Sequence, residues 1–330
     1  MILVTGATGF LGHNLIPQLR AAGHEVRALV RPTSDTRFLQ QHGVDLAYTD
    51  DISDPQAALY AMQGCDQVIH AAGQFRFWGD SLSFWQTNVA GTHALLAAAM
   101  AAAATAVPVR RFIHISTVVV VGKTDHIGVV DETAVCRPLE PYQRTKYEAE
   151  QLALAYHQAH GLPVIVLRPG AFYGPWGRYA FNRLFFEEPL RGWRIKVNGG
   201  KHITFPVYAL DVVQGIMLAL ENGRCGEIYN ICSQSLDHNS VNNIVSDAAG
   251  INRWRFNFPT WSVLSLAKTW TALSRFTGHE PFYPINLAPY VFQDWHVSTQ
   301  KAQTELGFQP TPFTTGAAET LAWYREEGIL

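Results

Sequence analysis

A glycine-rich turn directly after the first apolar run constrains the fold more than any other feature of the sequence. Residues 2–5 predict a strand, and residues 10–22 predict a helix that a following glycine ends. Gly6, Gly9 and Gly12 lie where the two elements meet. We expect the first glycine to permit a tight turn, the second to let the backbone approach a pyrophosphate, and the third to pack helix against strand. This order predicts a dinucleotide site whose phosphates meet the amides of the helix N-terminus.

Short β-branched runs and helical stretches continue to alternate through the first half of the chain. Further strands are expected at residues 25–30, 46–48, 67–71, 111–116 and 164–167, and further helices at 55–63, 88–104 and 142–160. The helix at 88–104 is rich in Ala, which has the highest helix propensity. This alternation predicts an α/β fold with a Rossmann-type, doubly wound parallel sheet over residues 1–170.

The rhythm breaks after about residue 170, where Gly, Pro and aromatic residues become more frequent. We expect helices at 211–221 and 316–327 and a strand at 227–231. These segments predict a smaller, mixed substrate domain over residues 171–330, partly interleaved with the first domain.

Composition excludes several classes of protein. The chain has 330 residues, a net charge of −2 and 48% hydrophobic residues, which fits a globular protein and shows no nucleic-acid footprint. Its four cysteines are scattered, and its histidines lack ligand spacing, so we expect no metal site. A strand at the N-terminus leaves no room for a signal peptide, and no apolar run has the length of a membrane span. We therefore expect a cytoplasmic enzyme with no nucleic-acid partner and no integral membrane segment.

Tyr142 and Lys146 are four residues apart in the helix expected at 142–160, which Pro141 can start. At this spacing both side chains project from one helix face. A free phenol has a pKa of about 10 and is a poor base at neutral pH, but a nearby ammonium lowers that pKa. Tyr142 is therefore expected to exchange a proton with a substrate oxygen while a nicotinamide exchanges hydride.

Three further motifs follow the glycine turn in order. They are Asp51-Ile52, Ile69-His70-Ala71-Ala72-Gly73 and Asn88-Val89-Ala90-Gly91-Thr92. With the glycine spacing G-x-x-G-x-x-G and the Tyr-Lys pair, they resemble the extended branch of the short-chain dehydrogenase/reductases, the NAD-dependent epimerase/dehydratase superfamily. The resemblance implies that the first motif contacts adenine and that Lys146 also holds the nicotinamide ribose. The cofactor-binding residues expected are Gly6, Thr8, Gly9, Phe10, Leu11, Gly12, Arg31, Asp51, Ile52, Ala71, Ala72, Gly73, Asn88, Tyr142, Lys146 and Pro169.

The resemblance also implies a third catalytic residue. In relatives a Ser or Thr lies five residues before a glycine, and counting back from Gly122 gives Thr117. Its hydroxyl would orient and polarise the substrate oxygen. Ser116 is adjacent and remains an alternative, and either hydroxyl can instead cap backbone at a strand end.

The end of the second strand favours NADP over NAD, although NAD stays possible. No carboxylate stands there to accept from a ribose 2′-hydroxyl. Arg31 can instead pair with a 2′-phosphate, and Thr33, Ser34 and Arg37 can add donors. The alternative is a solvated basic loop.

Two positions separate the chain from most nucleotide-sugar enzymes of the superfamily. Ala171 and Thr204 occupy places where those enzymes often have an Asn and an Arg against a diphosphate. Their Asp-Glu dehydratase motif is not evident either. What remains resembles the 3β-hydroxysteroid dehydrogenase and dihydroflavonol reductase branch, including hopanoid-associated sugar epimerase-like proteins, which share the stretch at residues 30–35. The resemblance implies a ketone or secondary alcohol on a bulky, largely apolar substrate. The alternatives are a nucleotide-sugar epimerase or dehydratase, and a non-enzymatic cofactor-binding regulator.

Aromatic residues in two regions are candidates for the substrate pocket. The stretch Gln74-Phe75-Arg76-Phe77-Trp78 follows the cofactor strand, and residues 254–295 are crowded with aromatics. For any single aromatic, core packing is the more frequent role. As a group they favour an apolar or ring-shaped ligand.

Residues 261–276 place apolar side chains near helical spacing between Pro259 and Gly278. A lid over the pocket, a peripheral membrane contact and core packing are the three interpretations. We favour a lid combined with packing, because an apolar substrate needs a cover that excludes water. A membrane contact is the least favoured of the three, because the segment has few basic residues.

The resemblance further implies a homodimer, in which two helices per subunit form a four-helix bundle. Here these would be the helices at 88–104 and 142–160, whose Ala residues allow close approach. Alternatively, the Ala residues only pack against their own sheet.

Overall fold

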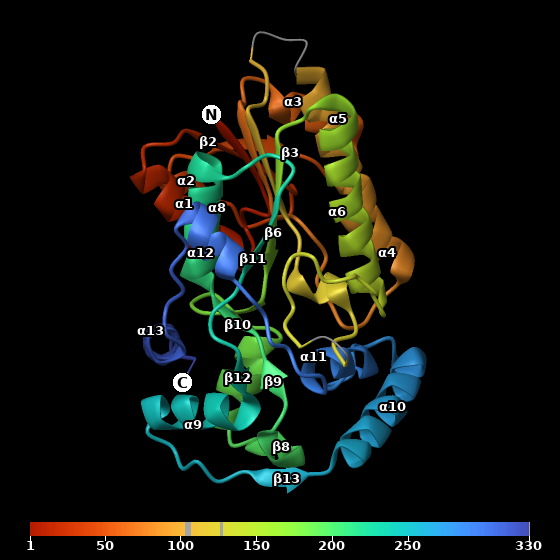
Figure 1. The fold of residues 1–330 in the computed structure, drawn as a ribbon, viewed down its shortest axis with the longest axis vertical. Helices are drawn as coiled ribbons and strands as arrows, with labels where there is room; N and C mark the ends of the chain where they lie inside the picture. Colours follow the sequence, from red (N-terminus) through yellow and green to blue (C-terminus); the bar gives the residue numbers. More distant parts are fainter. Residues whose placement is uncertain (103–106, 126–127, 330) are drawn as a thin grey trace.

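The computed structural model describes residues 1–102, 107–125 and 128–329. Within these residues the largest sheet has seven parallel strands in the order β11-β6-β5-β4-β1-β2-β3 (Figure 1). The strands are β1 Ile2–Thr5, β2 Val26–Val30, β3 Asp45–Tyr48, β4 Gln67–His70, β5 Arg111–Ile115, β6 Val164–Pro169 and β11 Ile228–Ile231. The predicted Rossmann-type sheet is confirmed, and its last strand comes from beyond residue 170.

Helices cover both faces of this sheet (Figure 1). One face packs against α1 Phe10–Ala21, α8 Ala209–Asn222 and α12 Gln300–Leu306, and the other against α3 Pro55–Met62, α5 Gly91–Ala102 and α6 Pro141–His160. Because side chains alternate along a strand, Val4 and Ile113 enter the first core while Leu3 and Phe112 enter the second. Burial on both faces explains why these strands read as continuous apolar runs.

The Ala-rich helix begins earlier than predicted. Its first turn is α4 Ser81–Trp85, followed by a π-helical turn η1 Gln86–Ala90 and then α5. Asp80 caps α4 by accepting a hydrogen bond from the backbone N–H of Ser83. Residues 103–104 of the predicted helix lie outside the described residues.

The second half of the chain forms a smaller lobe of short strands and helices below the carboxyl ends of the large sheet (Figure 1). Three two-stranded sheets pair β7 Ala171–Tyr173 with β10 Pro206–Tyr208, β9 Ile203–Thr204 with β12 Leu236–Asp237, and β8 Ile195–Val197 with β13 Phe256–Phe258. Helices α9 His238–Ala249 and α13 Phe313–Glu326 pack around an aromatic core, and α2 Arg37–Gln41, η2 Val118–Val121, η3 Arg183–Glu187, α7 Glu188–Leu190 and η4 Asn198–Gly200 are short. The predicted smaller, mixed C-terminal region is confirmed.

The helix expected at 261–276 is α10 Thr260–Thr277, but core packing is the wrong interpretation of its large side chains. Among its described side chains only Ala267 and Ser274 are buried, whereas Trp261 is 71% and Phe276 90% exposed. In the described part of the chain, this helix and the others are too short or too polar to cross a bilayer.

Candidate active site

The glycine turn between β1 and α1 has no room for side chains. Gly6 has a φ of +74°, and a Cβ there would lie 2.9 Å from the backbone of Ala71 on β4's outgoing loop. A Cβ on Gly12 would lie 2.1 Å from the carbonyl oxygen of Ala7. The first glycine therefore makes the tight turn and the third lets helix approach strand, as the sequence predicted.

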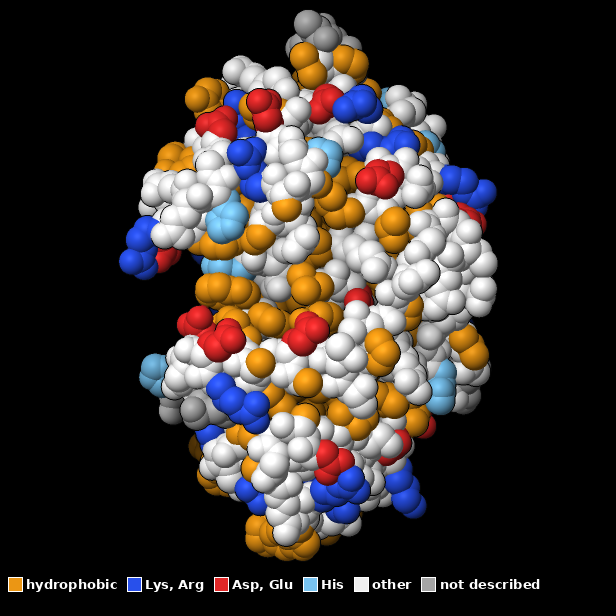
Figure 2. Space-filling view, turned by 90° about the vertical axis from the view of Figure 1, so that its left-hand side faces the viewer, with side chains coloured by type: hydrophobic (Ala, Val, Ile, Leu, Met, Phe, Trp, Pro, Cys, Tyr) orange, Lys and Arg blue, Asp and Glu red, His pale blue; other side chains and the backbone are white. Residues whose placement is uncertain are grey.

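A cleft of about 1300 Å³ runs from this turn to Tyr142 and on into the smaller lobe. Figure 2 shows a hollow with hydrophobic side chains between the upper and lower halves of the molecule. Most of the expected cofactor residues line the cleft: Gly6, Thr8, Gly9, Phe10, Leu11, Arg31, Asp51, Ile52, Ala71, Ala72, Gly73, Tyr142 and Lys146. The remaining three, Gly12, Asn88 and Pro169, are not among the residues that line it.

Asn88 supports the loop that lines the cleft rather than lining it. Its side chain is buried in the π-helical turn, where its Oδ1 accepts from the backbone N–H of Gln74 at 2.8 Å. Its Nδ2 donates to the Thr145 hydroxyl on α6 at 3.0 Å. Asn88 therefore ties the cofactor-side loop to the helix that carries Tyr142.

His70 has a comparable supporting place beneath the glycine turn. Its ring nitrogens hydrogen-bond the hydroxyls of Thr5 and Thr92, each at 2.8 Å. Burial lowers the pKa of His70 to about 3, so the ring stays neutral. Thr5 also accepts from the backbone N–H of Ala72, which fixes the loop after β4.

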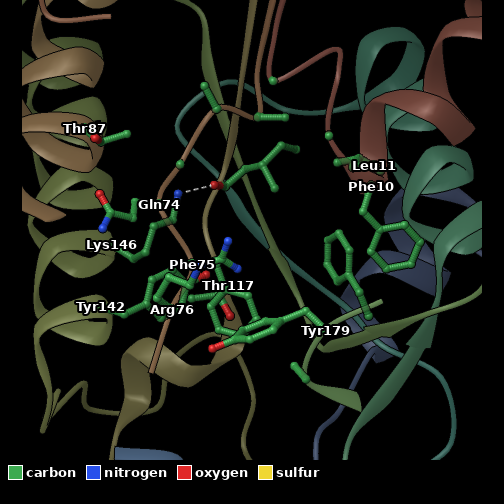
Figure 3. A pocket seen from close by; sticks show the side chains of 18 of the residues that line it. Phe10, Leu11, Gln74, Phe75, Arg76, Thr87, Thr117, Tyr142, Lys146 and Tyr179 are labelled. Atoms are coloured by element: carbon green, nitrogen blue, oxygen red, sulfur yellow. Dashed lines mark hydrogen bonds between the residues drawn. The ribbon is translucent and has the colours of Figure 1, made fainter. Parts of the chain in front are cut away.

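Tyr142 and Lys146 lie on one face of α6, with Thr117 between them and the opposite wall (Figure 3). Pro141 is the first residue of the helix, and the N-cap is Glu140, whose carboxylate accepts from the backbone N–H groups of Tyr142 and Gln143. The sequence analysis missed this cap, because Glu is less common at the position than Asp, Asn, Ser or Thr.

The electrostatics differ from the sequence-based expectation for Tyr142. Burial raises the pKa of its phenol, the charge of Glu140 raises it further, and only the Thr117 hydroxyl opposes these effects. The spacing suggested that the Lys146 ammonium lowers the pKa of Tyr142, but Lys146 does not contribute to the shift. Its ammonium instead donates to the carbonyl of Ile115 at 2.6 Å. In this state Tyr142 is a protonated acid.

Burial also acts on Lys146, which is 5% exposed. It lowers the pKa of the ammonium to about 8, and the nearby charge of Glu150 opposes that shift. A group that titrates this close to neutrality in a cleft is typical of a functional site.

The two candidate hydroxyls after β5 have different partners. Thr117 faces Tyr142 and donates weakly to the carbonyl of Pro169 at 3.5 Å. Ser116 donates to the buried carboxylate of Glu150 at 2.7 Å. That carboxylate also pairs with Arg168 at 2.5 Å. The geometry favours Thr117 for substrate contact, and reveals a buried Glu150–Arg168 pair that no local motif had marked.

Aromatic and aliphatic side chains line the far end of the cleft. They are Phe75, Phe77, Tyr179, Phe181, Leu184, Phe185, Phe205, Leu287, Tyr290 and Val291. The ring of Phe75 lies 4.8 Å from that of Tyr142, measured between centroids. Of the predicted stretch at 74–78, residues 74–77 form part of the wall, and Trp78 does not line the cleft.

The aromatic-rich region at 254–295 contributes less to the cleft than expected. In the described part of the chain, Tyr290 is its one aromatic in the lining, and α10 contributes no lining residue. Trp295 packs instead against Phe205 in the core. The expectation of an α10 lid is therefore wrong for this structure.

At the opposite end, Arg31 and Ser34 line the cleft beside Asp50 and Asp51. Arg31 has no carboxylate partner among the described residues. Arg37, by contrast, pairs with Asp35 at 2.5 Å. Of the proposed phosphate donors, Arg31 and Ser34 are therefore in place and Arg37 is engaged elsewhere.

These residues fit a nicotinamide dinucleotide, because a glycine turn without Cβ atoms faces the cleft at one end and a Tyr-Lys pair lies at the other. The family model described as NAD dependent epimerase/dehydratase matches residues 2–232. The chain belongs to this family. It is an extended short-chain dehydrogenase/reductase and an oxidoreductase.

Relatives of the chain include both reductases and nucleotide-sugar enzymes. Sterol demethylase protein B of Methylococcus capsulatus is 29% identical, with 99% of each chain covered. A ketoreductase of Stigmatella aurantiaca, which acts on a farnesyl dihydroquinoline oxide, is 30% identical, with 92% of this chain and 90% of the relative covered. The solved structure of a dTDP-glucose 4,6-dehydratase double mutant from Streptomyces venezuelae, with NAD bound, is 28% identical, covers 99% and 97%, and has a TM-score of 0.78.

Proposed function

We propose that this family member exchanges hydride between NADP and a ketone or secondary alcohol of a bulky, largely apolar substrate. The substrate would be steroid-, terpenoid-, flavonoid- or lipid-like. The observation that carries the proposal is the lining of the cleft beyond Tyr142. Among the described lining residues, the only carboxylates are Asp50 and Asp51, at the opposite end.

Residues of this chain supply the proton chemistry of such a reaction. Tyr142 is a phenol whose raised pKa keeps it protonated, so it donates its proton to the oxygen of a ketone. Thr117 donates to the same oxygen and polarises it. Lys146 would orient the nicotinamide ribose, and a bound nicotinamide would supply the hydride. The apolar wall of Phe75 and Phe77 excludes water from this step.

The second candidate is a nucleotide-sugar epimerase or dehydratase, which the relationship to dTDP-glucose 4,6-dehydratases favours. Ala171 and Thr204 both line the cleft, so neither place offers a charged donor to a diphosphate. Arg178 and Arg76 line it too, but Arg178 pairs with Glu187 at 2.6 Å and Arg76 lies over the Tyr179 ring at 4.9 Å. Elimination of water from a sugar also needs an acidic and a basic side chain. The residues that follow Thr117 are buried valines, which offer neither.

A panel assay separates these candidates and the non-enzymatic regulator. The protein is incubated with reduced cofactor and bulky ketones, or with oxidised cofactor and sugar nucleotides, while nicotinamide absorbance is followed. Net oxidation with an apolar ketone supports the proposal. A sugar product without net change supports the second candidate, and cofactor binding without any turnover supports the regulator.

We also propose that the protein is a homodimer paired through α5 and α6. The two helices pack on each other and on the sheet, and leave Ala155 exposed on the outer side of α6. Small side chains at this place let two helices of a second copy approach closely.

A further inference from the structure

Large hydrophobic side chains are concentrated on the surface of the smaller lobe. In the described part of the chain 21 such side chains are exposed, and ten of them lie within residues 193–195 and 254–282. We call these ten the aromatic surface: Trp193, Ile195, Trp254, Phe256, Phe258, Trp261, Leu266, Leu273, Phe276 and Phe282. Soluble monomers rarely expose such a concentration of large apolar groups, so the surface marks a binding face.

The strands and the helix that carry the aromatic surface are adjacent. β13 pairs with β8 in the register Phe256 to Ile195, and α10 starts two residues after β13 ends (Figure 1). Trp254 contacts Phe256 at 4.3 Å between ring centroids. Phe282 lies 6.4 Å from Trp193, so the segment after α10 returns to β8. These contacts join β8, β13 and the segment after α10, and Trp270 of α10 lies 5.9 Å from Phe282 between ring centroids.

Helix α10 turns four large apolar side chains to solvent, on a side that also carries the exposed Ser265 and Thr269. Trp261, Leu266, Leu273 and Phe276 fall within one half of the helix circumference at 100° per residue and are all exposed. Ala267 and Ser274, on the opposite side, are buried. The helix is long enough for five turns yet too polar to span a bilayer, which is the pattern of a helix that lies in the plane of a lipid interface.

Charge around the aromatic surface identifies its partner. Residues 189–201 and 250–282 contain eight Lys and Arg and one acidic residue, Glu280, whereas the whole chain has 25 basic and 27 acidic residues. Arg253 pairs with Asp247, Arg191 pairs with Glu187, and Arg255 is buried. Lys196, Lys201 and Lys268 have no carboxylate partner among the described residues. Trp and Phe among unpaired basic side chains suit an interface of anionic headgroups over hydrocarbon. Figure 2, which views the side away from α10, shows hydrophobic side chains at its lower end, with Lys and Arg and also Asp or Glu above them.

The aromatic surface is linked to the wall of the cleft. The backbone N–H of Ile285 donates to the Thr271 hydroxyl of α10 at 3.2 Å. Ile285 begins the short helix η5 Ile285–Leu287, and α11 Ala288–Val291 follows it. Leu287, Tyr290 and Val291 of these helices line the cleft. Only η5 and α11 would thus separate a bilayer against α10 from the apolar end of the cleft.

We propose that the aromatic surface binds the headgroup region of an anionic lipid bilayer, and that the substrate enters the cleft from that bilayer. The proposal of bilayer binding depends only on the properties of the aromatic surface. The entry of substrate rests on the proposed function, because only an apolar substrate partitions into lipid.

Co-sedimentation with vesicles tests the binding. The intact protein is mixed with vesicles of phosphatidylcholine, with or without phosphatidylglycerol. We expect binding to the anionic vesicles that weakens with salt, and loss of binding in Trp261→Ser/Phe276→Ser. Lys268→Glu should weaken it about tenfold. Leu59→Ser/Tyr60→Ser on α3 and Lys123→Glu are matched controls, since these residues are exposed and outside the surface.

Three outcomes overturn the proposal. The first is no sedimentation of the wild type with anionic vesicles at low salt. The second is equal binding by the surface variants and their controls. The third is a lower mass of Trp261→Ser/Phe276→Ser than of the wild type, measured by light scattering without lipid. That result would make a second copy of the chain the partner of the surface. If the double variant unfolds, the sedimentation of Lys268→Glu with anionic vesicles still tests the proposal.

Turnover separates substrate entry from the proposed function. Trp261→Ser/Phe276→Ser should lose activity on a vesicle-borne ketone and keep it on a water-soluble one. Equal activity on both would contradict entry from the bilayer. Wild-type inactivity on every ketone would instead contradict the proposed function, and leave the sedimentation result standing.

Discussion

Lys146 shows a conflict between stability and function at the scale of one residue. Its pKa is about 8 in the folded chain, below the usual 10.5. The buried ammonium therefore destabilises the fold at pH values below 8, and this penalty fades as the pH rises to 10.5. We predict that Lys146→Met raises the free energy of unfolding at pH 7, by up to about 3 kcal/mol, and abolishes turnover.

Thermal melts of the wild type and Lys146→Met at pH 7 and pH 10 check this. The difference between the two proteins should shrink toward pH 10. A variant that is less stable at pH 7 would show that the hydrogen bond to Ile115 outweighs the burial of charge.

Arg31 is the residue on which the choice of cofactor depends. It lines the adenine end of the cleft and has no carboxylate partner among the described residues. We predict tighter binding of NADP than of NAD, and a loss of about 1–3 kcal/mol for NADP alone in Arg31→Ala. Calorimetry with both cofactors measures this, with Arg37→Ala as the control, because Arg37 already pairs with Asp35. Tighter binding of NAD by the wild type would refute the preference.

At the scale of elements, α6 carries Tyr142, Lys146 and Glu150 on successive turns. Glu150 is fully buried against Arg168 and accepts from Ser116. We predict that Glu150→Gln lowers the free energy of unfolding by about 3–5 kcal/mol, because it leaves a buried guanidinium unpaired. It should also shift the pKa of Lys146 further down, since the Glu150 charge opposes the burial effect.

Denaturant unfolding and the pH profile of turnover measure the two effects of Glu150→Gln. The double variant Glu150→Met/Arg168→Met is the control, since it removes both charges and should recover most of the stability. If Glu150→Gln proves as stable as the wild type, the pair does not hold α6 in place.

The sheet and its order of elements could be predicted from the sequence, because strands buried on both faces read as unbroken apolar runs. Tyr142 and Lys146 could be placed on one helix face for a similar reason, since their spacing is local. The Glu150–Arg168 pair could not, because its partners are 18 residues apart and meet only when α6 packs on β6. The exposure of α10 likewise depends on tertiary packing, whereas the Glu140 cap is local and was missed because Glu is uncommon at an N-cap.

The aromatics at 254–295 show where composition misleads. An apolar residue in the substrate half can face ligand, core or solvent, and hydrophobic spacing along a helix does not distinguish these. Trp295 entered the core, Tyr290 reached the cleft, and Trp261 faces solvent. Only the packing around each side chain decided its place.

At the scale of the whole molecule, we predict a twofold dimer through α5 and α6. Light scattering at micromolar concentration should give twice the mass of the chain, and Ala155→Arg should give the mass of one chain. Tyr60→Arg, exposed on α3, is the matched control. A monomeric wild type would contradict the interface.

The central claim is that Tyr142 donates a proton to a ketone oxygen while its carbon accepts hydride from the nicotinamide. The most direct test uses NADPH with deuterium at the transferable position, and mass spectrometry of the product of a bulky apolar ketone. The account predicts one deuterium on the product carbon with wild type, and a rate about 10²–10⁴-fold lower with Tyr142→Phe, which still binds cofactor. Product from a sugar nucleotide with oxidised cofactor and no net formation of NADPH, or an unchanged rate with Tyr142→Phe, would contradict it.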